Sequence, residues 1–333
     1  MRRWQDLRRL FWMVFVLLLA AAGAGYWWVN QSLGLSTPVV DLSIEPGTSP
    51  RGVAQDAVDA GVQASPQLLY WWFRLSGQAR LIKAGSYELQ GEITPRSLLS
   101  KLVRGEEALR AVTLVEGLTF KQFRQLLSKA DQLTQETQGL TPDLIMQKLD
   151  HPGLAPEGRF YPDTYTYTKG SSDLAVLKRA LRAMDRHLDA AWQLRQGDSP
   201  LKTPDGLLTL ASIVEKETGR ASDRPMVAAV FTNRLRIGMM LQTDPSVIYG
   251  LGDKFDGNLH RRDLQKDTPW NTYTRAGLPP TPISMPGKAA LLAAVQPAKS
   301  RALYFVARGD GSSQFSDTLE AHNRAVGQYQ LGQ

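Results

Sequence analysis

A glutamate at the end of an apolar helical pattern is the residue best suited to acid–base chemistry. Apolar residues recur at spacings of three and four from Leu207 to Val214, which predicts a helix. On a helical wheel this stripe leads to Glu217, whereas Glu215 falls on the opposite shoulder. A carboxyl group beside apolar side chains is partly desolvated, which raises its pKa and keeps it protonated near neutral pH. Glu217 is therefore the expected general acid. Glu215 is the alternative, with a solvated ion pair as its structural role.

The segment after this glutamate predicts a second helix and a polar loop. Ser222-Asp223-Arg224-Pro225 combines an N-cap residue with a proline that the first turn tolerates, so a helix is expected from there to Gly238. The loop Leu241-Gln242-Thr243-Asp244-Pro245 follows, and we expect it to face the end of the first helix. Two packed helices with ordinary solvated charges are the alternative explanation of this pattern.

Composition and charge narrow the classes of function. The chain has 333 residues and a formal net charge of +7, and its first nine residues contribute +3 of that charge. The small remaining excess, with no basic patch interleaved with aromatic residues, disfavours nucleic-acid binding and suits an acidic cell-surface polymer. The sequence contains no cysteine, which excludes disulfides and thiol chemistry. Its four histidines lack metal-ligand spacing, and no cofactor is expected.

The N-terminus has the pattern of a membrane anchor. Leu10 to Trp28 is a run of 19 residues without a formal charge. As a helix this run spans about 28 Å, close to the roughly 30 Å of membrane hydrocarbon. Arginines precede it and Tyr26-Trp27-Trp28 end it, which predicts a single-pass membrane protein with residues 1–30 as cytoplasmic stub and anchor and the rest outside the cytoplasm. A signal peptide cleaved near Ala22-Gly23-Ala24 is the alternative.

The remaining chain predicts a linker, a small module and a larger domain. Residues 31–38 are a short polar linker. Residues 39–108 are expected to fold as β-α-α-β, with strands at 39–44 and 83–89. The second helix of this module has an expected core stripe, made by Leu68, Leu69, Trp72, Phe73 and Leu75.

Residues 109–333 should form the larger domain. In it we expect strands at 111–115 and 303–307 and helices at 174–192 and 319–329. The aromatic, turn-rich stretch 157–165 is expected to form the wall of a groove, and the prolines between 269 and 297 a rigid loop.

Several short motifs occur in a fixed order along this chain. They are Ala211-Ser212-Ile213-Val214-Glu215-Lys216-Glu217-Thr218, Asn233-Arg234-Leu235, Leu241-Gln242-Thr243-Asp244-Pro245, Asn271-Thr272-Tyr273, Gly277-Leu278-Pro279-Pro280 and His322-Asn323. On these motifs the chain resembles the YceG-like family of membrane-anchored endolytic murein transglycosylases. The resemblance implies an α+β fold class, with an N-terminal transmembrane helix, a LysM-like glycan-binding module at 39–108 and a catalytic domain at 109–333. Ser313 and Gln296 depart from this resemblance, since relatives often have histidine at both places.

The resemblance also implies an activity and a set of site residues. The β-1,4 bond between N-acetylmuramic acid and N-acetylglucosamine would be cleaved within nascent peptidoglycan strands without water, leaving 1,6-anhydro ends and terminating elongation. Glu217 would act first as acid and then as base, with no cofactor. The candidates for binding saccharide groups are Thr218, Asn233, Gln242, Thr243, Asp244, Asn271 and Tyr273. Peptidoglycan strands, the inner membrane and the glycan-polymerising synthases are the implied partners.

Two other classes of function remain open at this point. A hydrolytic muramidase would use a second carboxylate, for which Asp244 and Asp223 are the candidates. A non-catalytic glycan-binding scaffold of the envelope would have no need of Glu217.

Overall fold

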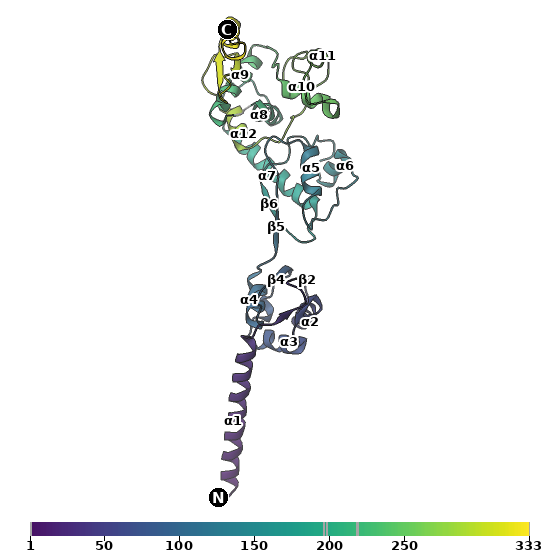
Figure 1. The fold of residues 1–333 in the computed structure, drawn as a ribbon, viewed down its shortest axis with the longest axis vertical. Helices are drawn as coiled ribbons and strands as arrows, with labels where there is room; N and C mark the ends of the chain where they lie inside the picture. The colour runs from purple at the N-terminus through teal and green to yellow at the C-terminus, as the bar shows by residue number, and fades with distance from the viewer. Residues whose placement is uncertain (1, 196, 198, 218–219, 333) are drawn as a thin grey trace. The chain divides into compact units, whose positions relative to one another are not determined.

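The computed structural model describes residues 2–195, 197, 199–217 and 220–332, and it has the expected mixture of helices and strands. The chain divides into two compact units, residues 1–110 and 111–333 (Figure 1). Each unit has its own hydrophobic core, and the second unit has two.

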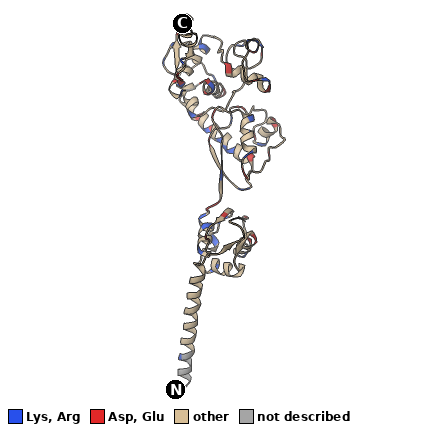
Figure 2. Cartoon of the chain, in the orientation of Figure 1, with Lys and Arg blue, Asp and Glu red and all other residues tan. Residues whose placement is uncertain are grey.

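The first unit begins with α1 (Arg2–Val29), a single long helix. Its segment Leu10–Val29 is long and apolar enough to cross a membrane, and it carries no Lys, Arg, Asp or Glu (Figure 2). Apolar side chains from Leu10 to Trp27 are exposed around the whole helix. A helix that is apolar on every side needs an apolar environment, which is consistent with the expected membrane anchor.

The rest of the first unit is built on an antiparallel strand pair, β2 (Val39–Ile44) with β4 (Gly85–Gln90). Alternate residues of β2 are buried, as expected for a strand with one face on a core. Three helices complete this core: α2 (Pro50–Ala60), α3 (Pro66–Leu75) and α4 (Pro95–Arg104). The short strands β1 (Gly34–Leu35) and β3 (Val62–Gln63) form a second pair, so the expected linker contains a strand. A 3₁₀ turn covers Ala79–Leu81.

The core stripe expected for α3 was wrong at two positions. Leu69 and Phe73 are fully buried, whereas Leu68 and Leu75 are 50% and 79% exposed. Only a narrow face of α3 packs against the core. That face is made by Leu69 and Phe73, which lie four residues apart.

The first core of the second unit lies under β5 (Leu109–Thr113) and β6 (Thr164–Thr168), which pair with each other. It also contains α5 (Phe120–Ser128), α6 (Pro142–Lys148) and the N-terminal half of α7 (Asp173–Gln193). Phe160 and Tyr165 are buried in this core, so the expectation of a groove wall is wrong for these aromatics. The strand β6 was not expected.

The second core surrounds α8 (Pro204–Glu217), which packs against α7, α9 (Arg224–Arg236) and α12 (Lys288–Val295). Every residue of α8 from Leu207 to Val214 is buried, so the expected stripe was too narrow. The helix α12 was not expected, because the prolines around it indicated a rigid loop. Its residues Lys288–Val295 are nevertheless rich in alanine and leucine, which favour helices. Figure 1 shows α7 running from the first core to the second.

Short elements complete the second unit. They are α10 (Asp244–Leu251), α11 (Arg261–Gln265), the antiparallel pair β7 (Tyr304–Ala307) with β8 (Ser313–Ser316), α13 (Leu319–Gln330) and 3₁₀ turns at Ala221–Asp223 and Gly252–Lys254. The polar loop expected at 241–245 therefore ends in a helix that sequence reasoning missed.

Candidate active site

Glu217 lies at the end of α8 and lines a cavity of about 370 Å³ in the second unit. The side chains around it come from segments far apart in the sequence. They are Glu217, Arg234, Leu241, Gln242, Asp244, Tyr273, Tyr304, Phe305, Leu319 and His322.

The carboxyl group of Glu217 is held by a threonine hydroxyl. Thr243 is buried, and its Oγ1 donates to Glu217 Oε1 at 2.5 Å. Burial is the main cause that raises the pKa of Glu217, and the nearby charge of Asp244 raises it further. The hydrogen bond from Thr243 and the charge of Arg234 oppose this rise. A carboxyl in this state can donate a proton at a pH where an exposed glutamate cannot.

Glu215 has a different environment from the one expected. Its side chain is only 7% exposed, so the expected solvated ion pair is wrong. One carboxylate oxygen accepts a hydrogen bond from Gly287 N at 2.9 Å, and the other lies 3.4 Å from Arg224 Nη2. Glu215 thus joins α8 to the start of α9 and to the residue before α12, and it does not line the cavity of Glu217.

Three of the expected saccharide-binding residues do line this cavity, namely Gln242, Asp244 and Tyr273. The hydroxyl of Tyr273 donates to Asp244 Oδ1 at 2.6 Å, which fixes both side chains. Gln242 has a φ of 50°, an uncommon conformation for a residue other than glycine. Its N–H donates to Thr272 O, and this bond helps to hold the strained backbone. Thr218 lies outside the described residues.

Two expected saccharide-binding residues lie elsewhere and hold the protein's own backbone. Asn233 Nδ2 donates to the carbonyls of Ser300 and Ala302. Asn271 is fully buried, its Nδ2 donates to three carbonyls of residues 263–266, and its Oδ1 accepts from Tyr273 N. Both asparagines therefore shape loops near the cavity, and we leave them out of the proposed saccharide contacts.

Sequence reasoning passed over three residues of this cavity, although two lie inside the motifs. Arg234 is 7% exposed, donates to the carbonyls of Leu303 and Leu241, and lies over the ring of Tyr304 at 5.4 Å. The ring of His322 stacks on Tyr304 at 5.2 Å between centroids. Periodicity could not single these residues out, because only the packing of α13 on β7, and of β7 on α9, brings them together.

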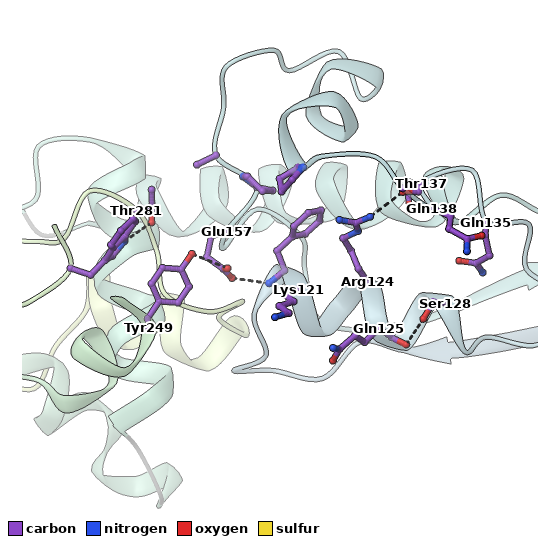
Figure 3. A pocket seen from close by; sticks show the side chains of 16 residues that line it. Lys121, Arg124, Gln125, Ser128, Gln135, Thr137, Gln138, Glu157, Tyr249 and Thr281 are labelled. Atoms are coloured by element: carbon purple, nitrogen blue, oxygen red, sulfur yellow. Dashed lines mark hydrogen bonds between the residues drawn. The ribbon is translucent and has the colours of Figure 1, made fainter. Parts of the chain in front are cut away.

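A third glutamate has a raised pKa but belongs to a separate, larger cavity of about 820 Å³ (Figure 3). Glu157 is 6% exposed, and burial raises its pKa to about 7. Its two oxygens accept hydrogen bonds from Phe120 N at 3.0 Å and from the hydroxyl of Tyr249 at 3.1 Å. The sequence placed Glu157 in a turn and offered no apolar stripe to mark its burial.

Neither Asp223 nor a metal cluster adds to the site. Asp223 Oδ2 accepts from Ser313 N at 2.7 Å, and Asp223 does not line the cavity of Glu217. Within the described residues, no group of three or more His, Asp or Glu side chains is placed to hold a metal ion. The site therefore contains the desolvated carboxyl of Glu217 and, near it, a second carboxyl, Asp244, which accepts a hydrogen bond from Tyr273.

A mixed helix and strand fold with one desolvated glutamate in a polar cavity defines a class of proteins suited to single-carboxyl acid–base chemistry. The chain belongs to the YceG-like family, whose model matches residues 42–328. It is 30% identical over 314 residues to the endolytic murein transglycosylase of Bacillus subtilis, covering 88% of this chain and 86% of that one. It is 28% identical to the endolytic murein transglycosylase of Streptococcus pneumoniae, covering 95% of this chain but only 64% of that relative.

A solved structure supports the same family. The crystal structure of a YceG-like protein from Listeria monocytogenes is similar with a TM-score of 0.53 and 28% identity, over 87% of this chain and 99% of that one.

Proposed function

We propose that this protein is a lytic transglycosylase that cleaves peptidoglycan strands internally and leaves 1,6-anhydro-N-acetylmuramic acid ends. The observation that carries the proposal is the carboxyl group of Glu217, whose pKa burial raises and which Thr243 holds at a cavity. Relatives named endolytic murein transglycosylase at about 30% identity support the same activity.

A single carboxyl suffices for this reaction. Glu217 protonates the oxygen of the β-1,4 bond between N-acetylmuramic acid and N-acetylglucosamine, and the bond to C1 breaks. The resulting carboxylate removes the proton from the C6 hydroxyl of the muramoyl residue, whose oxygen attacks C1 in place of water. Glu217 ends protonated as it began, and the reaction consumes no cofactor. Gln242, Asp244 and Tyr273 are the proposed contacts to the saccharide, and Thr243 orients Glu217.

The first unit supports this reaction without taking part in its chemistry. We propose that α1 anchors the chain in the inner membrane with residues 39–108, a LysM-like module, and the catalytic unit in the periplasm. There the enzyme would terminate nascent strands made by the glycan-polymerising synthases.

The mass of the released ends tests the proposal. Purified glycan strands are digested with the full chain in detergent, and the new termini are analysed by mass spectrometry. We expect anhydro ends, lighter by one water than hydrolysed ends. Hydrolysed ends would support a muramidase that uses Asp244, the second carboxylate in the cavity, as its base. Absence of any cleavage would favour a glycan-binding scaffold.

A further inference from the structure

The larger cavity of the second unit is a separate site. It shares no lining residue with the cavity of Glu217. Side chains of α5 form one wall, and Tyr249 and Thr281 lie on the other side, with Glu157 between them (Figure 3). The reaction proposed above leaves this cavity without a role.

The α5 wall is cationic. Lys121, Arg124, Gln125 and Ser128 follow each other at helical spacing and all line the cavity. Arg124 Nη2 donates to Thr137 O at 3.0 Å, but Arg124 forms no ion pair with any carboxylate in the part of the chain that the structure describes. Lys121 pairs with Asp253, and both side chains are exposed, so this pair is weak and open to exchange.

The opposite wall is aromatic. The rings of Tyr249 and Trp270 meet edge to face at 5.5 Å, and Trp270 Nε1 donates to Thr281 Oγ1. Gln125 and Gln138 add side-chain amides, each with donors and an acceptor that match peptide groups. Both oxygens of Glu157 are already engaged by Phe120 and Tyr249. The available groups therefore suit a ligand with carboxylates, amides and small apolar side chains.

The two cavities are joined by short pieces of chain. Asp244 and Tyr249 lie on α10, one in each cavity, and five residues of helix rise about 7.5 Å. Trp270 and Tyr273, three residues apart in a turn, also line one cavity each. The two cavities therefore lie close together along α10.

We propose that this larger cavity binds the carboxylate-bearing peptide branches of the strand that is cleaved at Glu217. The inference rests on the proposed function, because a peptide-bearing glycan is the polymer that this function supplies. Arg124 pairs with a peptide carboxylate, Lys121 adds long-range attraction, and the aromatic wall contacts the apolar side chains of the peptide.

Equilibrium binding tests the proposal without any cleavage. The probe is N-acetylmuramoyl-L-alanyl-D-glutamate, which has no glycosidic bond to cut, titrated calorimetrically into the full chain in detergent micelles. Arg124→Gln should weaken binding about 10- to 150-fold, since a charge-assisted hydrogen bond contributes about 1.5–3 kcal/mol. Lys129→Gln, an exposed charge just after α5 that does not line the cavity, is the matched control and should change affinity less than about twofold.

The other arms of the experiment separate the sources of binding. The probe with its glutamate carboxylates amidated should bind about as weakly to the wild type as the acidic probe binds to Arg124→Gln. Equal binding of both probes, or equal affinity of Arg124→Gln and wild type, would overturn the proposal. So would displacement of the probe by an equimolar amount of inorganic phosphate. Thermal melts check the fold, and Lys121→Gln, at an exposed position, should weaken binding about threefold if Arg124→Gln does not fold.

This result is independent of the cleavage assay. If anhydro ends form but the peptide probe does not bind, only the proposed peptide site is refuted. If the probe binds but no anhydro ends form, the proposed activity is refuted and the cavity is still a peptide-binding site.

Discussion

At the scale of single residues, three glutamates of the second unit show that the neighbours of a buried carboxyl group determine its role. Burial raises the pKa of Glu157, Glu215 and Glu217 alike. Glu215 has an arginine beside it and a main-chain donor, and Glu157 has two fixed donors. Glu217 receives one hydroxyl donor and faces the cavity that Gln242 and Tyr273 line. Among these three glutamates, only Glu217 has a raised pKa and also lines the cavity in which we propose that cleavage occurs.

Replacing Glu217 by glutamine should abolish most of the activity and leave the fold intact. Glutamine cannot deliver a proton, and positioned proton transfer contributes about 10²–10⁴-fold to rate. The amide oxygen can still accept the hydrogen bond from Thr243, so the melting temperature should stay close to that of the wild type. Release of anhydro ends from purified glycan measures the effect.

The matched variant Glu215→Gln should lower the stability of the fold and leave the activity nearly unchanged. It leaves the guanidinium of Arg224, only 15% exposed, without its carboxylate, and should lower the free energy of unfolding by about 1–3 kcal/mol. Its turnover per folded molecule should stay close to that of the wild type. A larger loss of activity in Glu215→Gln than in Glu217→Gln would show that the assignment of the general acid to Glu217 is wrong.

Glu157 should make stability depend on pH between about 4.5 and 7. Its pKa is raised from 4.5 to about 7 in the folded chain. Below pH 4.5 the group is protonated in both states; as pH rises toward 7, only the unfolded chain releases the proton. Stability therefore falls with rising pH, by up to about 3 kcal/mol in total. Chemical denaturation across this range should show a smaller fall for Glu157→Gln, and identical slopes for the two proteins would refute the assignment.

At the scale of elements, the turn that carries Glu157 depends on a close backbone approach. Gly158 has a φ of 79°, and a Cβ there would lie 2.5 Å from the Cβ of Pro282. The proline-rich segment that includes Pro282 is itself tied to α8, since Ser212 Oγ accepts from Ile283 N at 3.0 Å. These contacts hold one wall of the larger cavity close to the helix that carries Glu217.

Gly158→Ala should therefore destabilise the fold more than a second glycine with the same backbone. Gly153 has a φ of 78° and nothing within 4 Å of a Cβ, so Gly153→Ala should cost about 1–2 kcal/mol from backbone strain alone. Gly158→Ala should cost about 1–3 kcal/mol more, because the methyl group overlaps Pro282. Urea unfolding of the two variants makes the comparison. Equal losses would mean that the approach to Pro282 imposes no constraint.

At the scale of the whole molecule, the apolar surface of α1 and the basic residues before it argue for one orientation in a membrane. Arg8 and the neighbouring arginines precede the apolar run, and cytoplasmic flanks of membrane helices carry such an excess of positive charge. The rest of the first unit and the second unit would then lie outside the cytoplasm, where peptidoglycan is found.

The absence of cysteine makes this topology directly testable. Single variants Arg8→Cys and Asp143→Cys introduce one exposed thiol each, before α1 and in the second unit. A membrane-impermeant maleimide should label Asp143→Cys in intact cells with a permeabilised outer envelope, and Arg8→Cys only after lysis. The opposite labelling pattern would show that the chain has the opposite orientation in the membrane. N-terminal sequencing of the extracted protein checks that the anchor is retained, and a start near Gly25 would indicate a cleaved signal peptide.

Local patterns determined much of this protein. A charge-free run of anchor length, the alternation in β2, and the helix start at Arg224-Pro225 depend on neighbours within a few positions. The same short-range pattern pointed to α8 and to Glu217 at its end. These features could be predicted because periods of two and of three to four residues are written directly in the sequence.

Only the tertiary structure decided which groups meet at the candidate site. Thr243 reaches Glu217 across 26 residues and Tyr249 reaches Glu157 across 92, and no local pattern encodes such pairs. Asn271 and Glu215 were misjudged for the same reason, since a polar side chain in a sequence looks alike whether it meets water, a backbone carbonyl or an arginine. Burial and partner choice come from packing of distant segments, and those fix the pKa and the accessibility on which function depends.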